Sequence, residues 1–313
     1  MILLDGLWGS GKSLLAPLVS SLRGVGPFTV RANVEAICHM LASKRMADDV
    51  FKFLFLNGVI EDAYDSSIGR GINLRIWDDS SYFRTLRLWE IIKRVTSRTS
   101  ENDLVSRLPE AQAYFQLTHL LTQSSESLFR VLPDHVTVIN IQRDPTFLFN
   151  HWEKYLRRWD NDRETTLAFE FRGAKVPFFA EQWAEEWVSL SLADRSALAV
   201  ARCASYERNA LARNGTPPGL VHTVYFAELL RAPDRVLSQL SRTLGRDFSL
   251  ATKRQVQRLT RDLRHKTQQV RPELIEGAQN IFLGQIRDAT SPQVFEEFYS
   301  AVQVFETHES LQR

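Results

Sequence analysis

Apolar residues gather along the chain in short runs that are separated by stretches of helical spacing. The run at residues 2–4 stands directly before a glycine-rich turn, and residues 136–141 (VTVINI) form the clearest β-branched run. Runs of similar character occur at residues 28–31, 72–77 and 220–226. Short apolar runs bounded by polar turn residues are typical of buried strands, so each is predicted to be a strand.

Helical spacing fills most of the intervals. The predicted helices are residues 12–22, a helix capped by Asn33, residues 49–56, a long helix after Pro145, residues 194–214, a helix from Pro233, and a last helix from Ser291–Pro292. Pro17 removes a backbone donor inside the first helix, so we expect an irregularity there. Asn57-Gly58 are expected to end the third helix. The interval that follows Asp79 is expected to be mostly helical.

Strands that alternate with helices predict an α/β fold, in which a parallel sheet is flanked by helices on both faces. The length of 313 residues and the absence of internal repeats favour a single domain over residues 1–313. Residues 150–215 are interpreted as a helical insertion, a candidate acceptor-side subregion. The apolar stripe near the end of the chain predicts a packed C-terminal helix.

Composition narrows the functional classes. The formal net charge is +2, which gives no reason to expect a nucleic-acid or membrane-surface partner. There are two cysteines, Cys38 and Cys203, and no basic leader or long apolar run is visible. We therefore expect a cytoplasmic enzyme with no membrane partner. The oligomeric state cannot be read from the sequence.

Residues 6–13 read Gly-Leu-Trp-Gly-Ser-Gly-Lys-Ser and match the phosphate-loop pattern G-x-x-x-x-G-K-[ST] in full. In such a P-loop, glycines allow successive amides to converge on phosphate oxygens at a helix N-terminus. The apolar strand before it and the helix after it provide the expected context. The predicted nucleotide-binding residues here are Gly6, Trp8, Gly9, Ser10, Gly11, Lys12, Ser13 and Leu14.

Arg143-Asp144-Pro145 follows the run at residues 136–141, where a parallel strand delivers its C-terminal end. In one interpretation, Arg143 binds a second phosphate through its planar donor fork. In the other, Asp144 caps a helix, Pro145 occupies its first turn, and Arg143 is solvated. These residues alone do not decide between the two.

Taken together, these motifs resemble the sulfotransferase superfamily. In that family the N-terminal loop holds the 5′ end of 3′-phosphoadenosine 5′-phosphosulfate, and Arg-Asp/Asn-Pro with a downstream hydroxyl residue holds its 3′-phosphate. The resemblance extends to residues 224–230, Pro233 and Leu244-Gly245, in the family's order. It implies that Arg143 and His151 bind the 3′-phosphate, since His151 stands where the family has serine.

The chain departs from the family pattern inside the loop. Gly9 precedes Ser10-Gly11 where the family usually has a basic residue, and Lys12 follows Gly11 where it has Thr or Ser. This is a loop of nucleoside-triphosphate style. It keeps a P-loop kinase or NTPase open as an alternative, with Mg-ATP or Mg-GTP as its cofactor.

Three residues are candidates for catalysis. Lys12 is predicted to stabilise charge on the transferred group. Glu35 and His39 are one helical turn apart and share a face, and Glu35 is the favoured base. Each also has a structural interpretation: Glu35 complements the start of its helix, and His39 is an ordinary surface or core histidine.

Further polar groups bear on the alternatives. Asp78-Asp79 end an apolar run as a Mg²⁺-binding carboxylate would in a kinase, or cap a turn. Arg261, Arg264 and Lys266 form a basic segment that either closes over a phosphate or is a solvated helix face. Aromatic residues between Trp152 and Trp187 either line an acceptor cleft or, more commonly, form the core of the insertion.

The favoured hypothesis is therefore a sulfotransferase, a transferase that moves a sulfuryl group from 3′-phosphoadenosine 5′-phosphosulfate to a hydroxyl or amine. Its acceptor would be a small molecule or a glycan, and no metal would be needed. The alternatives are the Mg-dependent P-loop kinase or NTPase and a nucleotide-binding protein without catalytic activity.

Overall fold

A computed structural model of the chain describes residues 1–67, 73–76, 81, 83, 89, 91–92, 96, 113–133, 135–159, 166–212, 220–265 and 272–312. Its centre is a five-stranded sheet with the order β2-β3-β1-β4-β7, in which every neighbouring pair is parallel. The strands are β1 Ile2–Asp5, β2 Val25–Val30, β3 Ala113–Leu117, β4 Thr137–Gln142 and β7 Val221–Tyr225. The predicted α/β class with a parallel sheet is confirmed.

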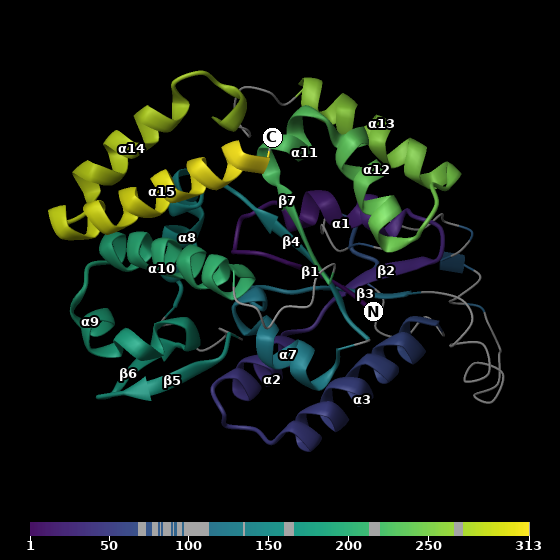
Figure 1. Cartoon of the computed structure of the whole chain (residues 1–313), viewed down its shortest axis with the longest axis horizontal. Helices are drawn as coiled ribbons and strands as arrows, with labels where there is room; N and C mark the ends of the chain where they lie inside the picture. The colour runs from purple at the N-terminus through teal and green to yellow at the C-terminus, as the bar shows by residue number, and fades with distance from the viewer. Residues whose placement is uncertain are drawn as a thin grey trace.

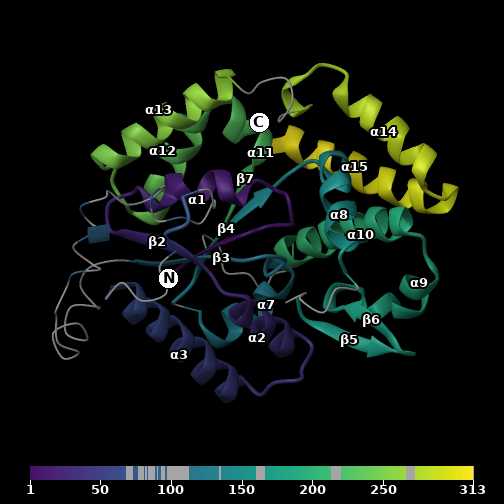
Figure 2. The ribbon, with the colours of Figure 1, turned by 180° about the vertical axis from the view of Figure 1, so that it is seen from behind.

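Helices cover both faces of this sheet (Figures 1 and 2). On one face, Ile2 and Leu4 pack in an apolar cluster with residues of α1 Lys12–Ser20, α11 Phe226–Arg231, α12 Pro233–Leu244 and α13 Leu250–His265. On the other, Leu3 packs in a cluster with α2 Ala32–Ala42, α3 Asp48–Ser67 and α7 Ser125–Val131. Alternate residues of the strand β1 point to opposite faces, so one short apolar run serves both cores.

A third apolar cluster lies beside the sheet. It is formed mainly by α8 Phe149–Leu156, α9 Ala184–Ser189, α10 Leu192–Ala212, α14 Ala278–Ala289 and α15 Pro292–Gln312. Trp152 and Trp187 are almost fully buried in it. The core interpretation of the aromatic segment therefore holds for these two rings, and the predicted C-terminal helix packs against α10. The short 3₁₀ segments are η1 Thr122–Ser124, η2 Pro145–Phe147, η3 Phe178–Trp183 and η4 Pro272–Leu274.

The region predicted as a helical insertion is not purely helical. It contains the antiparallel hairpin β5 Ala168–Phe171 and β6 Ala174–Pro177. The intervening Arg172-Gly173 both adopt positive φ, at 50° and 78°. Two residues with positive φ are typical of the turn in a two-residue β-hairpin. The two strands have four residues each, too few to show a clear alternation of apolar and polar positions in the sequence.

Two predictions about strands were wrong. Residues 73–76 of the run at 72–77 form no strand, and residue 76 lies in a turn. By contrast β3, in the interval expected to be mostly helical, is a central strand between β1 and β2. Its residues Ala-Tyr-Phe-Gln-Leu mix polar and apolar positions, and in the fold the hydroxyl of Tyr114 donates a hydrogen bond to Gln116. Only pairing with two other strands makes this weak pattern a strand.

Three helix boundaries also differ from the predictions. The helix α3 continues through Gly58 to Ser67, where Val59 packs against the core and Asp62 pairs with Arg31 at 2.9 Å. The helix α2 starts at Ala32, so Asn33 lies in its first turn instead of capping it. The helix α1 includes Pro17 and ends at Ser20, two residues before its predicted end.

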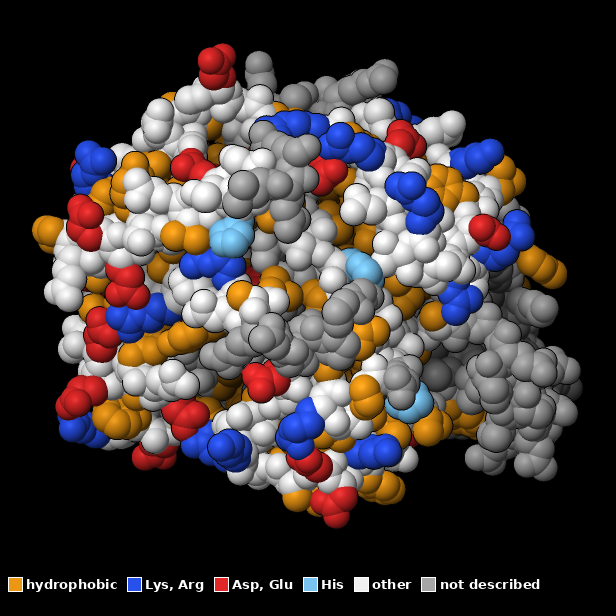
Figure 3. Space-filling model, viewed as in Figure 1, with side chains coloured by type: hydrophobic (Ala, Val, Ile, Leu, Met, Phe, Trp, Pro, Cys, Tyr) orange, Lys and Arg blue, Asp and Glu red, His pale blue; other side chains and the backbone are white. Residues whose placement is uncertain are grey.

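No helix among the described residues is long and apolar enough to cross a bilayer. On the face of Figure 3, basic and acidic side chains are interspersed.

Candidate functional site

The glycine-rich loop starts at the C-terminal end of β1, the middle strand of the sheet. Asp5, the last residue of β1, is fully buried and accepts hydrogen bonds from the segment after β3. The donors are Thr118 Oγ1 at 2.9 Å, the Leu121 amide at 3.1 Å, and the amide and hydroxyl of Thr122, each at 2.6 Å. This network fixes the base of the loop against the end of β3.

Close packing requires glycine at two places in the loop. Gly11 precedes α1 with a φ of 104°, and a Cβ there would stand 2.3 Å from the Phe226 ring. Gly9 has a φ of 83°, and its Cβ would stand 2.9 Å from Cγ of His151. Any side chain at these positions would strain the backbone and displace a ring. The loop is therefore seated directly between α11 and α8.

The loop directs its carbonyl oxygens toward protein donors. Lys12 Nζ donates to the carbonyl oxygens of Gly6 and Leu7, both at 2.7 Å. The indole of Trp152 donates to the carbonyl of Trp8 at 3.0 Å, and Arg143 NH1 donates to that of Gly9 at 2.7 Å.

The backbone N–H groups at the end of the loop have no hydrogen-bond acceptor in the described part of the protein. Within the part of the chain that the structure describes, the amides of Gly11, Lys12 and Ser13 donate to no protein acceptor. They stand at the N-terminus of the nine-residue helix α1, where the helix dipole adds partial positive charge. Ser10 Oγ beside them is buried and has no partner among the described residues. This is the donor set of an anion site.

Lys12 is only 4% exposed. Burial lowers its pKa to about 8, while the nearby carboxyl groups of Asp5, Glu35 and Glu207 oppose the shift. Two of its three N–H donors bind the loop, so one remains for a ligand. The Lys12 ammonium is thus held at the loop by backbone carbonyls and not by an ion pair.

Asp144 has the capping role of the second interpretation, whereas Arg143 is not solvated as that interpretation expected. Asp144 accepts a hydrogen bond from the amide of Thr146 at 2.8 Å, so it does cap the turn that Pro145 begins. Arg143 is not solvated: its side chain is 15% exposed, and it contacts Gly9 of the loop. Its Nε donates to Glu273.

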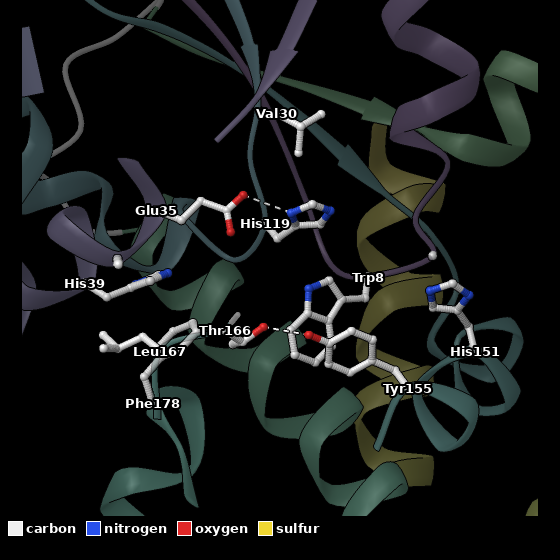
Figure 4. A pocket seen from close by; sticks show the side chains of 12 residues that line it. Trp8, Val30, Glu35, His39, His119, His151, Tyr155, Thr166, Leu167 and Phe178 are labelled. Atoms are coloured by element: carbon white, nitrogen blue, oxygen red, sulfur yellow. Dashed lines mark hydrogen bonds and ion pairs between the residues drawn. The ribbon is translucent and has the colours of Figure 1, made fainter. Parts of the chain in front are cut away.

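A cavity of about 260 Å³ opens beside the loop (Figure 4). Its ionisable lining residues are Glu35, His39, His119 and His151, and the other lining side chains include Trp8, Val30, Tyr155, Thr166, Leu167 and Phe178. The prediction that Glu35 and His39 share a face agrees with this arrangement. No Lys or Arg is among the described residues that line the cavity.

Glu35 and His119 are in hydrogen-bond contact with one another in the wall of this cavity. Oε1 of Glu35 lies 2.9 Å from Nδ1 of His119. Burial raises the pKa of Glu35 to about 8 and lowers that of His119 to about 3, so both groups are neutral at pH 7. The contact is therefore a hydrogen bond between uncharged groups and not an ion pair. In Figure 4 the second ring nitrogen of His119 lies on the side away from Glu35.

Sequence reasoning missed His119 because it missed β3. His119 stands two residues beyond the end of that strand, at the same edge of the sheet as the loop. The alternation of Phe115 and Leu117 with Tyr114 and Gln116 was the available signal for a half-buried strand.

The other two histidines are also neutral. Burial lowers the pKa of His39 to about 3, and its ring stacks on Phe178 with centres 3.7 Å apart. Its Nδ1 lies 3.1 Å from Ser124 Oγ, while Nε2 is buried without a partner in the described part of the chain. The ring of His151 packs on Gly9, and burial and the charges of Lys12 and Arg143 lower its pKa.

Other predicted residues have different surroundings. Trp8 packs against Trp152 and Tyr155 and also borders the cavity. Ser13 is exposed. Leu14 packs against the apolar core, and its amide donates to the Gly11 carbonyl, so it is not available for a phosphate.

The Asp78-Asp79 pair that favoured a kinase, and the basic segment of Arg261, Arg264 and Lys266, fall largely outside the described residues. Asp78 and Asp79 lie outside the described residues, as does Lys266, and the side chain of Arg264 is not described. Arg261 is exposed on α13. The described residues contain no group of three or more His, Cys, Asp or Glu side chains placed to hold a metal ion.

No family model and no curated protein matches the chain. Solved structures that are similar to it include two sulfotransferase domains and one sulfotransferase. The sulfotransferase domain of the olefin synthase from Synechococcus PCC 7002 has 13% identity and a TM-score of 0.45, covering 98% of this chain and 94% of that one. The sulfotransferase domain of the curacin biosynthetic pathway has 11% identity and a TM-score of 0.44, with 91% and 96% covered. Sulfotransferase STF9 from Mycobacterium avium has 13% identity and a TM-score of 0.38, with 93% and 76% covered.

Proposed function

We propose that the protein is a sulfotransferase that uses 3′-phosphoadenosine 5′-phosphosulfate as donor and a hydroxyl or amine of a small molecule as acceptor. The proposal depends on one observation, which is that the phosphate loop and the Glu35–His119 pair border the same cavity. The loop borders the cavity through Trp8 and Gly9, and the Glu35–His119 pair lines the same cavity, so a donor bound by the loop would lie next to a proton acceptor. The family order of the sequence motifs supports the choice of donor.

The residues fit the 5′ end of such a donor. The free amides of Gly11 to Ser13, the remaining donor of Lys12 and the unpartnered hydroxyl of Ser10 suit its anionic oxygens. Arg143 contacts the loop at Gly9 and would bind the 3′-phosphate. The donor supplies an activated sulfuryl group, whose S–O bond to the 5′-phosphate breaks as the acceptor oxygen or nitrogen forms a new one.

Lys12 would stabilise the negative charge that grows on the departing 5′-phosphate, since it is buried and already oriented by two carbonyls. The acceptor loses a proton during the reaction. We assign it to Nε2 of His119 in the form in which Glu35 has lost its own proton: Nδ1–H of His119 then donates to the Glu35 carboxylate, whose negative charge balances the positive imidazolium. Since burial raises the pKa of Glu35 to about 8, the share of this form grows as the pH rises toward 8. This refines the prediction that Glu35 is the base: Glu35 orients His119, which receives the proton.

His39 has a different role in this scheme. His39 lines the cavity and stacks on Phe178, and its buried Nε2 has no partner among the described residues. It would hydrogen-bond the acceptor. The cavity has the volume of roughly nine liquid waters, which suits a small molecule better than a glycan chain.

Phosphoryl transfer from Mg-ATP or Mg-GTP is the second candidate. It is favoured by Lys12 and Ser13 directly after Gly11, the arrangement in which the lysine binds terminal phosphates and the hydroxyl binds Mg²⁺. A nucleotide-binding protein without catalysis would use the same loop.

Calorimetry with adenosine 3′,5′-bisphosphate, Mg-ATP and Mg-GTP separates these candidates. We expect the bisphosphate to bind without a metal, and Lys12→Ala to weaken it. Binding of the triphosphates alone, with loss of affinity in Ser13→Ala, would favour phosphoryl transfer instead. Turnover of the labelled donor with small alcohols, phenols and amines would exclude the binding-only alternative.

A further inference from the structure

In the proposed function Arg143 binds the 3′-phosphate. In the structure its guanidinium already has an anionic partner, Glu273. Its NH1 donates to the Gly9 carbonyl, and its Nε donates to Oε1 of Glu273. Its guanidinium carbon lies 4.7 Å from the centre of the Phe226 ring, which covers one face. The Glu273 carboxylate therefore occupies an edge of the guanidinium that a phosphate would use.

The contact satisfies Glu273 incompletely. Its side chain is 4% exposed, and Oε2 is buried with no hydrogen-bond partner among the described residues. A buried carboxylate that pairs through one oxygen gives up hydration without full compensation. A phosphate offers three acceptor oxygens to the same guanidinium, so it would be the stronger ligand for Arg143.

Several acidic side chains lie around the Arg143–Glu273 pair. A cavity of about 280 Å³ is bordered by Arg143 and Arg231 and by four acidic side chains, Asp144, Glu273, Glu306 and Glu309. Gln279 donates to both Asp144 and Glu306, at 2.9 and 2.8 Å. An anion that entered while Glu273 remained would add to this negative charge, whereas an anion that replaced Glu273 would leave it nearly unchanged.

Glu273 belongs to a short element. It is the middle residue of the three-residue segment η4, which is followed by Gly277 in a left-handed conformation, at φ 75°, before α14. Among the described residues, Arg143 is the one hydrogen-bond partner of the Glu273 side chain, so rotation away from it would break no hydrogen bond to a helix or strand.

We propose that Glu273 is an internal competitor for the nucleotide, which occupies Arg143 until a phosphate displaces it and so lowers the affinity of the site. This inference rests on the proposed function, because it takes the displacing group to be the 3′-phosphate. The exchange is non-covalent: one anionic partner of Arg143 replaces another.

The test compares two ligands in calorimetry, adenosine 3′,5′-bisphosphate and adenosine 5′-monophosphate, which lacks the 3′-phosphate. Glu273→Gln keeps the shape of the side chain and removes its charge. We expect it to tighten bisphosphate binding about tenfold, the scale of one hydrogen bond to a charged group, and to leave monophosphate binding unchanged. Glu276→Gln is the matched control, since Glu276 is exposed three residues away, and it should change neither affinity.

Equal or weaker binding of the bisphosphate by Glu273→Gln would overturn the inference while leaving the proposed function intact, and would mean that Glu273 orients Arg143. Glu273→Ala distinguishes the two roles again: competition predicts tighter binding, and orientation predicts weaker binding. If neither wild type nor variants bind the bisphosphate, but Mg-ATP binds, the proposed function itself fails. Unfolding midpoints without ligand show whether the variants are folded.

Discussion

Two cavities differ in the charge of the side chains that line them: one is bordered by Trp8 and Gly9 of the glycine-rich loop, and the other by Arg143, which donates to the Gly9 carbonyl. The cavity beside Glu35 and His119 is lined by aromatic and neutral groups, because burial outweighs every nearby charge there. The cavity beside Arg143 is lined by ionisable groups of both signs, held by direct pairs such as Arg143 with Glu273. A neutral wall suits proton transfer to and from an uncharged acceptor, whereas a paired guanidinium suits the exchange of one anion for another.

Lys12 lies at the loop itself, bound to the carbonyls of Gly6 and Leu7, and its replacement should have the largest effect. Lys12→Met should lower turnover about a thousandfold, since it removes a preorganised cation from the departing group. The measurement is release of adenosine 3′,5′-bisphosphate from the labelled donor with the best acceptor of a small-molecule panel. Ser20→Ala, at the far end of α1, serves as the control. Retention of most activity in Lys12→Met would remove the lysine from the mechanism.

The neutral cavity is tested by His119→Asn and Glu35→Gln. Each should lower turnover about a hundredfold, the usual contribution of a general base, and leave the affinity for adenosine 3′,5′-bisphosphate unchanged. The role of Glu35 as a positioning residue adds a second readout, because Glu35→Gln should shift the pH profile of the remaining activity. An equal loss of bisphosphate affinity in both variants would place the pair in donor binding.

The charged cavity is tested by Arg143→Ala. It should weaken adenosine 3′,5′-bisphosphate about thirtyfold, because one charge-assisted contact to phosphate is lost, and spare adenosine 5′-monophosphate. Calorimetry with both ligands measures the difference. If both ligands weaken equally, Arg143 acts by holding the loop at Gly9 and not by binding a phosphate.

The smallest expected effect concerns Glu207, which tests whether burial determines the protonation state of the carboxyl groups near Lys12. This residue of α10 is 4% exposed, and burial raises its pKa to about 8. Because the pKa of Glu207 is higher in the folded than in the unfolded protein, its contribution to the free energy of unfolding is complete below pH 4.5, where both states are protonated. This contribution is lost as the pH rises through 8. Glu207→Gln should therefore gain at least about 1 kcal/mol in unfolding free energy relative to wild type between pH 5 and pH 8.

Denaturant unfolding at the two pH values measures this gain, with the exposed Glu170→Gln as control. A gain that is the same at both pH values would show that Glu207 is ionised in the folded protein and that a partner, not burial, determines its state.

Local patterns predicted a large part of this molecule. The strands β1, β4 and β7 coincide with apolar runs, and the loop follows β1 as its glycine pattern requires. The errors lie where the pattern was weak or misleading. The helix α3 passes Gly58 because tertiary contacts of Val59 and Asp62 beyond it offset the local cost of glycine, about 1 kcal/mol.

The sequence by itself determined the α/β alternation and the glycine-rich loop, because both depend on residues that are neighbours along the chain. Only the tertiary structure decided what stands on either side of that loop. Glu35 meets His119 across 84 positions, and Arg143 meets Glu273 across 130. Neither partner carries a local signal, since an isolated histidine or glutamate has the same pattern in any solvated turn. The protonation of the first pair depends on burial, which exists only once the sheet and its helices have packed.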